Sequence, residues 1–473
     1  MLNRRHLIGS MAALGAVVSS AKARAAGTRA ARAPAKALEG RIIYRKDSRY
    51  EAFRQAAVWN ALKPQRYPEA IVMAESVDDV IAAVQLAKAR GWQVGARSGG
   101  HGWVAPHLRD HSVLINISRM KELKVDAERR IAVVSPGWQG QAFNRILREQ
   151  HGLMFPSGHC YGIGLGGFIL AGGHGWNSRL WGPGCAQLVA LDLVNADGEV
   201  VHASESENSD YLWAARGGGA GFPGVAVRFW LKLYPRPKVM MFSDWGYPAE
   251  TFDEVLNWYG EALHTFPKSM EGSLQGRYQD GKPVIHVAGR VITDSEEEAH
   301  AALEIVARCP AAKRSFSQAL RVPAVWPGDT ESPATLSPTG ARFVTDGAWT
   351  DAPTAEIVRR IRPFFDAYPT KESWYLWMMW GETQQLPDMA YSIQGHSYLS
   401  PNATWYDPAD DARCARWAQD TIDAVRDIAN GGQMNDDNMA ANKLPYLSPA
   451  AATRLTAIQQ KYDPQRRFVG FLT

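Results

Sequence analysis

Hydrophobic residues in the first half of the chain fall into short runs that alternate with longer amphipathic segments. Short runs rich in Val, Ile and Leu are typical of strands, whereas apolar residues three and four apart are typical of helices. The pattern predicts strands at residues 70–74, 93–96, 112–117, 131–134, 190–194 and 200–203, and helices at 77–90 and 138–150. Asp197-Gly198, between the last two strands, is the signature of a tight hairpin turn.

A different pattern begins after Pro235-Arg236-Pro237, which interrupts any regular element. Helices are predicted at residues 248–265, 295–308, 354–367 and 408–429, with aromatic-rich strands between them. In the most aromatic strand, residues 373–380, side chains alternate between two faces. The even-numbered residues therefore share one face and the odd-numbered residues share the other. We expect one face to pack in a core against helices. The other face would line a pocket, where aromatic surfaces suit sugar rings, aromatic alcohols or fused-ring metabolites.

The composition is that of a globular chain of two to three domains, with 473 residues, 46% hydrophobic and 21% charged. The net charge of +4 arises at the N-terminus, because residues 1–41 hold eight Lys or Arg and one Glu. The other 44 basic and 47 acidic residues give a net charge of −3, which leaves no electrostatic footprint for nucleic acid. Cys160, Cys185, Cys309 and Cys414 are too widely spaced for a disulfide-dense scaffold or a zinc site.

The N-terminus has the pattern of an export signal. Arg4 and Arg5 precede an apolar stretch that ends at Val18, and small residues follow. This predicts a twin-arginine signal peptide at residues 1–26 and a linker at 27–40; the alternative is a basic disordered tail. The stretch is too short to span a membrane, and no later segment offers the roughly 20 apolar residues that a span needs. We expect the twin-arginine (Tat) export machinery as a partner, a periplasmic or secreted product, and no stable membrane span.

Two glycine-rich segments each contain a nucleophile, His101 within residues 96–102 and Cys160 within residues 157–167. Glycines let backbone N–H groups approach a phosphate closely, and an imidazole or a thiolate can attack an electrophilic ring. Taken singly, the first segment could be a surface turn and Cys160 a small packing residue. However, the glycine run at residues 162–175 has too few side chains for an ordinary core. These residue types therefore indicate a phosphate-bearing ligand near a His and a Cys.

Five motifs in this order carry a resemblance to a known family: residues 97–101, residues 160–167, residues 195–198, residues 212–219 and residues 462–464. From about Tyr67 to the C-terminus, the chain resembles the vanillyl-alcohol oxidase and p-cresol methylhydroxylase (PCMH) superfamily, and within it the berberine bridge enzyme-like oxidases. The resemblance implies an α+β fold with a two-part, PCMH-type FAD-binding domain at residues 41–237. A substrate domain, an antiparallel sheet backed by helices, would cover residues 238–430. Residues 431–473 would then return to the FAD domain.

The same resemblance implies that FAD is bound by two covalent bonds, an 8α-histidyl bond from His101 and a 6-S-cysteinyl bond from Cys160. Val225 would lie in a strand near the adenine end of the cofactor. Further contacts with the cofactor would come from both glycine loops, through Arg97, Ser98, Gly99, Gly100, Gly164, Gly166 and Gly167. If Cys160 binds the flavin, three cysteines remain, so at least one would be an unpaired thiol.

The catalytic base is the point at which this chain departs from the family. In the family's oxidases the usual candidate is the Tyr of a late Tyr-x-Asn segment, and the matching position here is Gln433. Glutamine cannot act as a base. The replacement candidates are His174, Tyr391 and His396, together with His159, Asp436 and Asp437. The alternatives are that the histidines only hydrogen-bond the flavin or a backbone carbonyl and that the two aspartates form a solvated turn.

The expected function is therefore that of an exported FAD-dependent oxidase or dehydrogenase. Its small-molecule substrate would be an alcohol, a sugar hydroxyl or a related C–H donor, and O2 or another acceptor would take up the electrons. The alternatives are oxidation of an amine or alkaloid-like metabolite and, because of Gln433, a flavin-binding protein with weak turnover.

Overall fold

The structure, a computed structural model, describes residues 34–326, 338–381, 385–434 and 436–472. The signal peptide expected at residues 1–26 and the first half of the expected linker, residues 27–33, lie outside these ranges. Within them, no helix has the length and apolar character needed to cross a membrane.

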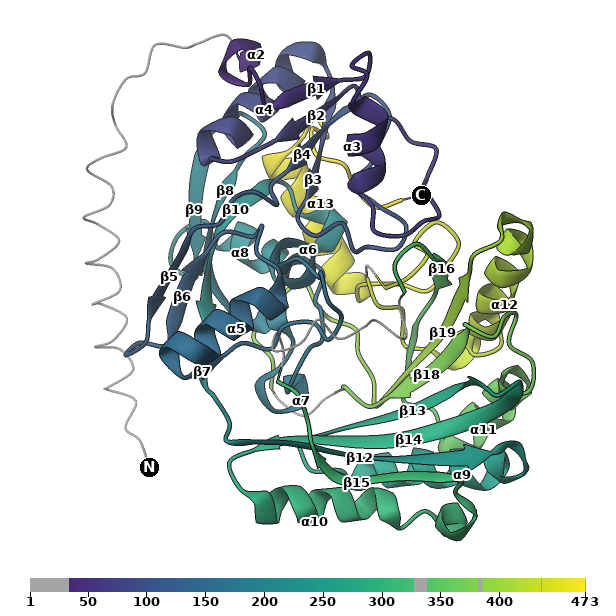
Figure 1. The fold of residues 1–473 in the computed structure, drawn as a ribbon. Helices are drawn as coiled ribbons and strands as arrows, with labels where there is room; N and C mark the ends of the chain where they lie inside the picture. The colour runs from purple at the N-terminus through teal and green to yellow at the C-terminus, as the bar shows by residue number, and fades with distance from the viewer. Residues whose placement is uncertain (1–33, 327–337, 382–384, 435, 473) are drawn as a thin grey trace.

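The N-terminal part of the chain forms two sheets that lie next to each other (Figure 1). The first has the order β1 (Ile42–Tyr44), β2 (Ala70–Met73), β4 (Ser112–Asn116), β3 (Gln93–Arg97), with only β1 antiparallel to its neighbour. The second is antiparallel, in the order β5 (Leu123–Asp126), β6 (Ile131–Val134), β10 (Val225–Lys232), β8 (Leu188–Val194), β9 (Val200–Ser204). A separate ribbon pairs β7 (Leu153–Met154) with β11 (Tyr234–Pro235). All six strands expected in this half are confirmed.

The helices of this part include α4, which has the bounds that the sequence predicts because both its ends carry capping signals. The Ser76 hydroxyl accepts the N–H of Asp79 at 3.2 Å, the Asp79 carboxylate accepts the N–H of Ser76 at 3.1 Å, and Gly91 ends the helix with φ of 68°. The buried face of α4 packs between the two sheets. The helices are α2 (Pro34–Ala37), α3 (Tyr50–Ala56), α4 (Val77–Arg90), α5 (Gly140–His151), α6 (Leu165–Leu170), α7 (Ser178–Trp181), α8 (Ser209–Ala215) and, near the C-terminus, α13 (Pro449–Tyr462).

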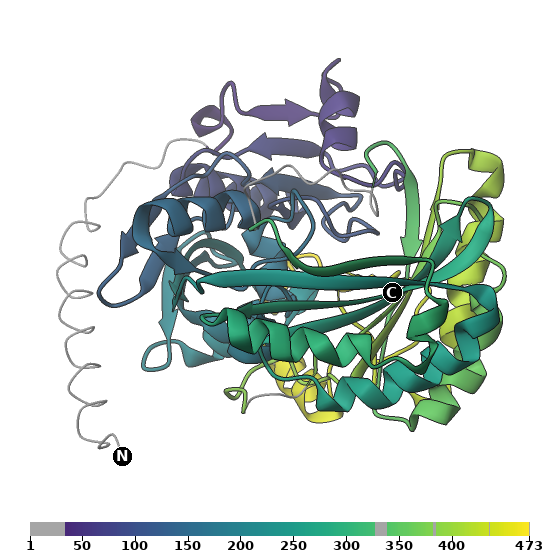
Figure 2. The same cartoon turned by 60° about the horizontal axis from the view of Figure 1, so that its bottom comes forward.

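The rest of the chain forms one eight-stranded antiparallel sheet. Its order is β15 (Ser317–Pro323), β12 (Val239–Pro248), β14 (Lys282–Thr293), β13 (Met270–Gln279), β18 (Trp374–Met378), β19 (Ser397–Trp405), β16 (Arg342–Thr345), and β17 (Ala348–Thr350) also pairs with β19. Four helices cover one face, and the N-terminal part faces the other (Figures 1 and 2). They are α9 (Phe252–Ala262), α10 (Glu296–Ala307), α11 (Thr354–Ile361) and α12 (Asp411–Asp423). The predicted α+β class, with an antiparallel sheet backed by helices, is confirmed.

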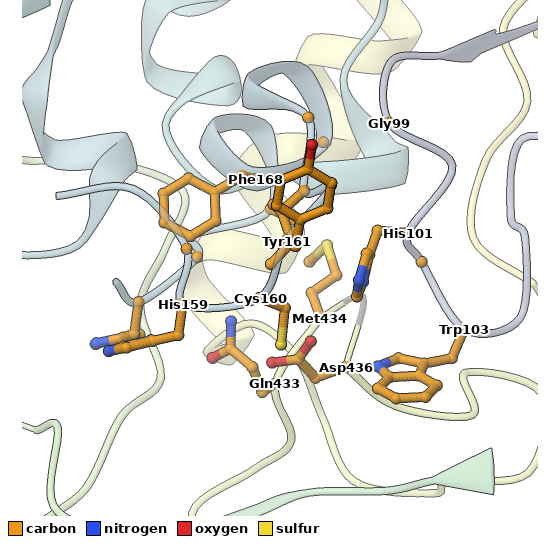
Figure 3. Close-up of a pocket in the computed structure, with 18 of the residues that line it drawn as sticks. Gly99, His101, Trp103, His159, Cys160, Tyr161, Phe168, Gln433, Met434 and Asp436 are labelled. Atoms are coloured by element: carbon orange, nitrogen blue, oxygen red, sulfur yellow. The ribbon is translucent and has the colours of Figure 1, made fainter. Parts of the chain in front are cut away.

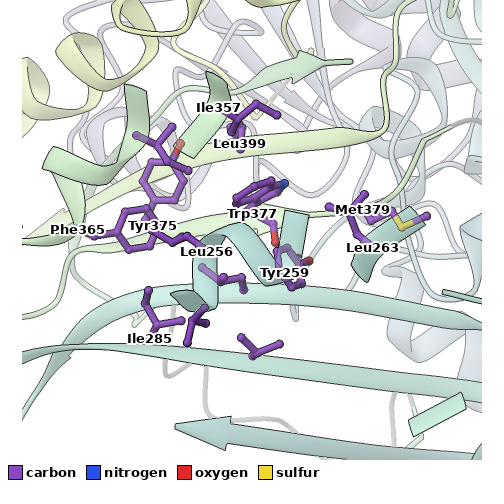
Figure 4. Close-up of a cluster of buried hydrophobic side chains, with 14 of the residues drawn as sticks. Leu256, Tyr259, Leu263, Ile285, Ile357, Phe365, Tyr375, Trp377, Met379 and Leu399 are labelled. Carbon is purple, nitrogen blue, oxygen red and sulfur yellow. Dashed lines mark hydrogen bonds between the residues drawn. The ribbon is translucent and has the colours of Figure 1, made fainter. Parts of the chain in front are cut away.

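The main core of this second part lies between the sheet and its helices (Figure 4). Tyr375 and Trp377 of β18 are fully buried in it, and Met379 follows on the same face. The Trp377 indole N–H donates to the Ser397 hydroxyl at 2.9 Å, and the Tyr259 hydroxyl of α9 donates to the Trp377 carbonyl at 3.0 Å. The predicted alternation is thus confirmed for the core-facing side of the strand.

The last residues of the chain run along β3. The Val94 N–H donates to the Arg467 carbonyl at 2.8 Å, and the Val469 N–H donates to the Val94 carbonyl at 3.0 Å. Phe468, between them, is buried in the same cluster as α4. The C-terminus therefore stabilises the first sheet.

Replacing Trp377 tests the division of β18 into two faces. Trp377→Ala removes a fully buried side chain and one buried hydrogen bond, so it should lower the free energy of unfolding by about 3–5 kcal/mol. Leu376→Ala, one residue away on the half-buried face, is the control and should cost clearly less. Urea unfolding monitored by circular dichroism measures both, and equal losses would contradict the assignment of faces.

Candidate active site

A cavity of about 980 Å³ lies between the two parts of the molecule. One wall consists of the two glycine-rich segments, and the opposite wall is the face of the large sheet that the helices leave uncovered. The even-numbered residues Trp374, Leu376, Met378 and Trp380 lie on that opposite wall, as the strand pattern predicts. All ten residues expected to contact the cofactor line the cavity: Arg97, Ser98, Gly99, Gly100, His101, Cys160, Gly164, Gly166, Gly167 and Val225.

The two glycine loops touch each other through their backbones. A Cβ atom on Gly99 would lie 2.4 Å from the backbone nitrogen of Gly164, and a Cβ on Gly164 would lie 2.4 Å from the nitrogen of Gly99. Ser98 adds a side-chain link, because its hydroxyl donates to the Pro136 carbonyl at 2.6 Å and accepts the Gly166 N–H at 3.4 Å. The glycines are therefore required for the contact between loops, a role that the sequence alone does not reveal.

His101 and Cys160 extend from these two loops into the same space (Figure 3). The His101 ring stacks on Trp59, with centroids 4.8 Å apart, and burial lowers its pKa to about 4. Cys160 is exposed to the cavity, whereas the thiols of Cys185, Cys309 and Cys414 are buried and reduced. Burial raises the pKa of Cys185 to about 12. Cys160 is thus the cysteine in position to react with a ligand.

Arg97 supports the first loop. Its guanidinium donates to the Gly99 carbonyl at 2.9 Å and to the Asn116 side chain at 3.3 Å, and burial lowers its pKa to about 10. These bonds fix the Arg-Ser-Gly-Gly turn before His101. In the part of the chain that the structure describes, no cluster of His, Cys, Asp or Glu could hold a metal ion.

His174 and Tyr391, two of the three proposed catalytic residues, form a buried pair. His174 Nε2 lies 2.7 Å from the Tyr391 hydroxyl, and His174 Nδ1 is buried without a hydrogen-bond partner. Burial lowers the pKa of His174 to about 3 and raises that of Tyr391 well above its usual range. The pair is therefore neutral at physiological pH, and neither ring nitrogen is open to the cavity.

His396, the third, lies apart from His174 and Tyr391. Its Nδ1 is 2.6 Å from the Asp351 carboxylate in a separate small pocket beside His264. Residues 391–396 form an irregular segment rather than a strand, and β19 begins only at Ser397. The two side chains consequently do not share a face.

Gln433 lines the cavity, and both ends of its side chain are occupied. Its amide nitrogen donates to the Gly172 carbonyl at 3.2 Å, and its oxygen accepts the Trp349 indole N–H at 3.1 Å. Its backbone N–H donates to the Asp437 carboxylate at 3.1 Å. Gln433 is therefore a fixed structural element of the wall.

The two aspartates that follow Gln433 differ in surroundings. Asp436 is exposed to the cavity beside His101 and Cys160 (Figure 3), and desolvation by the protein around that cavity raises its pKa to about 6. Asp437 is fully buried, so the expectation of a solvated turn is wrong at this position. Burial and the nearby Asp346 raise the Asp437 pKa well above its usual range. Sequence reasoning missed Asp346, which lies some 90 residues away and carries no motif.

His159 makes a direct link between the two parts of the molecule. Its Nε2 lies 3.0 Å from the Glu271 carboxylate of β13, and the other oxygen of that carboxylate accepts the Asn177 N–H at 2.8 Å. Both His159 and Glu271 line the cavity. The sequence analysis identified His159 as a candidate but not Glu271. The one sequence feature that could have indicated Glu271 is that it is an acidic residue inside a strand.

The glycine loops and two nucleophiles lie on one wall of the cavity, and a broad sheet forms the other wall. This arrangement defines a flavin-binding oxidoreductase fold, and three comparisons with known proteins agree with it. The model of the FAD binding domain matches residues 68–204. The FAD-linked oxidoreductase nodO of Hypoxylon pulicicidum is 32% identical over 422 residues, covering 88% of this chain and 93% of the relative. The chain belongs to the family of FAD-linked oxidoreductases.

Two solved structures share the fold. BBE-like 1 of Physcomitrella patens superposes with a TM-score of 0.80 at 19% identity, covering 93% of this chain and 98% of that one. The 6-hydroxy-D-nicotine oxidase of Arthrobacter nicotinovorans gives a TM-score of 0.76 at 21% identity, covering 91% and 96%. Both likenesses confirm the expected fold of a FAD-binding part and a second part built on an antiparallel sheet.

The buried acids predict a pH dependence of stability. Burial raises the pKa of Asp346 to about 7, whereas an unfolded Asp titrates near about 3.9. The folded state then binds the extra proton, so this residue's contribution to stability falls as pH rises from about 4 to about 7. The Asn side chain of Asp346→Asn cannot ionise, so this variant should unfold at a higher temperature than wild type at pH 8. At pH 5 the increase in its unfolding temperature should be smaller.

Thermal unfolding at both pH values measures this effect. Asp411→Asn is the control, because Arg342 lowers the pKa of Asp411 and loss of that charge should destabilise the protein at pH 8. A gain for Asp346→Asn that is equal at pH 5 and pH 8 would contradict the assignment.

Proposed function

We propose that the protein is an exported FAD-dependent oxidoreductase with a bicovalently bound flavin. It oxidises an alcohol, a sugar hydroxyl or a related C–H donor by hydride transfer to the flavin, with O2 as the electron acceptor. The observation that carries the proposal is that His101 and Cys160 project from separate glycine loops into one cavity (Figure 3).

The residues present suit FAD as the cofactor. A wall of closely packed glycine backbone, with no Cβ atoms at Gly99, Gly164 and Gly166, can accept an extended dinucleotide along its length. Val225 lies on the same side of the cavity and would contact the adenine end. When bound, FAD supplies a hydride acceptor that can pass electrons on to a second acceptor.

The two proposed attachment residues have suitable chemistry. Because burial lowers the pKa of His101 to about 4, its imidazole is neutral at pH 7 and carries a free electron pair. The Cys160 thiol is exposed to the cavity, and thiols are strong nucleophiles once deprotonated. Attachment through both side chains would hold the flavin across the contact between the loops.

The opposite wall supports a substrate with a ring and several polar groups. Trp374, Leu376 and Met378 offer a broad apolar surface, and the neighbouring strands add polar side chains to the same face of the sheet. These polar residues are Asp244, Ser273, Gln275, Arg277, His286, Ser400 and Asn402. Rings that carry hydroxyl groups suit such a mixture of stacking and hydrogen bonding.

A second candidate function is oxidation of an amine or alkaloid-like metabolite. The fold similarity to 6-hydroxy-D-nicotine oxidase favours it, since that name describes oxidation of a nitrogen heterocycle. A flavin-binding protein with weak turnover is the remaining alternative, because Gln433 cannot move a proton.

Export by the Tat machinery into the periplasm or the medium is part of the proposal. It is supported by Arg4 and Arg5 ahead of a short apolar stretch. The twin-arginine route carries folded proteins, so a chain that must acquire FAD before export would need it.

Single and double substitutions test the two covalent bonds. His101→Ala and Cys160→Ala should each leave the flavin attached through the remaining bond, and only the double variant should release it. Denaturation in acid, followed by visible absorption of pellet and supernatant, measures the release. Cys185→Ala is the control and should keep both bonds. Free flavin from either single variant would contradict attachment at two points.

A substrate screen tests the reaction. Glucose, xylobiose, benzyl alcohol and 6-hydroxynicotine are mixed anaerobically with the purified protein, and bleaching of the flavin absorbance identifies donors. For an oxidase, colour should return when air is admitted. Bleaching that persists in air but reverses with a quinone would identify a dehydrogenase instead, and bleaching by 6-hydroxynicotine alone would favour amine oxidation.

A further inference from the structure

Five histidines line the cavity, and they differ in which ring nitrogens remain available: His101, His107, His159, His174 and His286. Gln433 lines the same cavity but cannot act as a base, and both ends of its side chain are hydrogen-bonded, so the proton acceptor must come from elsewhere. The inference that follows rests on the proposed function and names the residue that would take the substrate's proton.

Three of these histidines are poorly suited to hold a proton at neutral pH. Burial lowers the pKa of His101 to about 4, and that of His107 and His174 to about 3. His107 Nε2 also lies 3.1 Å from the Ala57 carbonyl, and His174 has no ring nitrogen open to the cavity. His101 is in addition the proposed flavin attachment.

His286 belongs to a carboxylate–histidine pair on the sheet, but both of its nitrogens are occupied. Nδ1 lies 2.8 Å from the Asp244 carboxylate, and Nε2 lies 3.1 Å from the Gln279 side-chain oxygen. No ring nitrogen remains to receive a proton from a ligand.

His159 combines an oriented ring with an open nitrogen. Glu271 fixes Nε2 at 3.0 Å, and the ring packs between Trp176 and Trp380, with centroids at 4.5 and 5.9 Å. Within the described residues, no hydrogen bond reaches the Nδ1 atom of His159. This atom also does not belong to the polar atoms that are buried without a hydrogen-bond partner. Nδ1 is therefore accessible on a side chain that lines the cavity beside Cys160.

We propose that His159 is the catalytic base and that Glu271, from the opposite part of the molecule, is its positioning residue. The substrate's O–H bond breaks and an N–H bond forms at His159 Nδ1. The carbinol carbon loses its hydride, with the electron pair, to the family's cofactor FAD, and its C–O bond becomes C=O. The imidazolium that results lies against the Glu271 carboxylate, which stabilises its charge.

Several charged groups face this histidine from the elements around it. Glu271 and Asp436 are acidic and favour the imidazolium. His174 is neutral. Arg290 pairs with Glu271 across strands β14 and β13, and its guanidinium lies over the Trp176 ring at 5.0 Å. Its positive charge disfavours a second positive charge on the His159 ring. Glu271 makes the direct contact, so its removal should have the largest effect on the proton at His159.

The test compares His159→Gln, Glu271→Gln and Asp436→Asn in the flavin-loaded enzyme, with flavin retention in acid measured for each variant first. With an alcohol that bleaches wild type in the screen, His159→Gln should slow anaerobic flavin reduction by about 100-fold or more, with little change in the alcohol's apparent Kd. Glu271→Gln should cause a smaller loss and move the acid limb of the pH–rate profile to lower pH.

A second readout needs no substrate. The flavin absorbance of wild type, titrated from about pH 5 to about pH 9, should show a transition caused by the imidazole beside Cys160. Because Asp436, with a pKa of about 6, titrates in the same range, the comparison is made in Asp436→Asn, which should retain a transition, and adding His159→Gln to that variant should abolish it. His286→Gln is the matched control, because it alters the other carboxylate–histidine pair on the same cavity wall and should keep the transition.

The two outcomes are distinguishable. A transition that survives in the double variant His159→Gln/Asp436→Asn, or is already lost in Asp436→Asn, would overturn the assignment of the base while leaving the FAD proposal intact. A wild-type flavin spectrum that does not change with pH would also overturn the assignment. Failure to retain flavin in wild type would contradict the proposed function itself.

Discussion

The direct contact between two glycine loops is the constraint on which the site depends. Gly99 and Gly164 lie so close that a Cβ on either would meet the other's backbone nitrogen at 2.4 Å. This contact brings the loop after β3 and the N-terminal end of α6 together, although Gly99 and Gly164 lie 65 positions apart in the sequence. As a result, His101 and Cys160 open into the same cavity, and glycine backbone forms part of its wall.

The large sheet completes the site because its two faces have separate roles. Tyr375 and Trp377 form the core against the helices, while the alternate residues Trp374, Leu376 and Met378 face the cavity. The same sheet carries Glu271, whose carboxylate reaches across to His159 and to the Asn177 backbone. The two parts of the molecule are thus held together by a polar contact at the cavity itself, so changes in that contact would alter both domain arrangement and chemistry.

The sequence predicts those features that depend on local signals. The ends of α4 follow from the cap at Ser76 and the glycine at position 91, and the faces of β18 follow from strict alternation. The cofactor wall is also predictable, because its glycines and nucleophiles form compact motifs. The Glu271–His159 contact and the Asp346–Asp437 pair join positions about 90 to 110 residues apart, and no local pattern shows that these residues meet. The separation of His396 from His174 and Tyr391 also depends on the irregular path of the chain before β19, which no local pattern predicts.

Attachment of one flavin to both loops is the central claim, and peptide mass spectrometry measures it most directly. Cleavage after Arg and Lys should give one peptide of residues 98–109, which contains His101, and another of residues 149–179, which contains Cys160. The predicted result is a single flavin-containing species in which both peptides are joined through the cofactor, with fragment ions that place the bonds on His101 and Cys160. Recovery of both peptides unmodified, or of a flavin on only one of them, would contradict the claim.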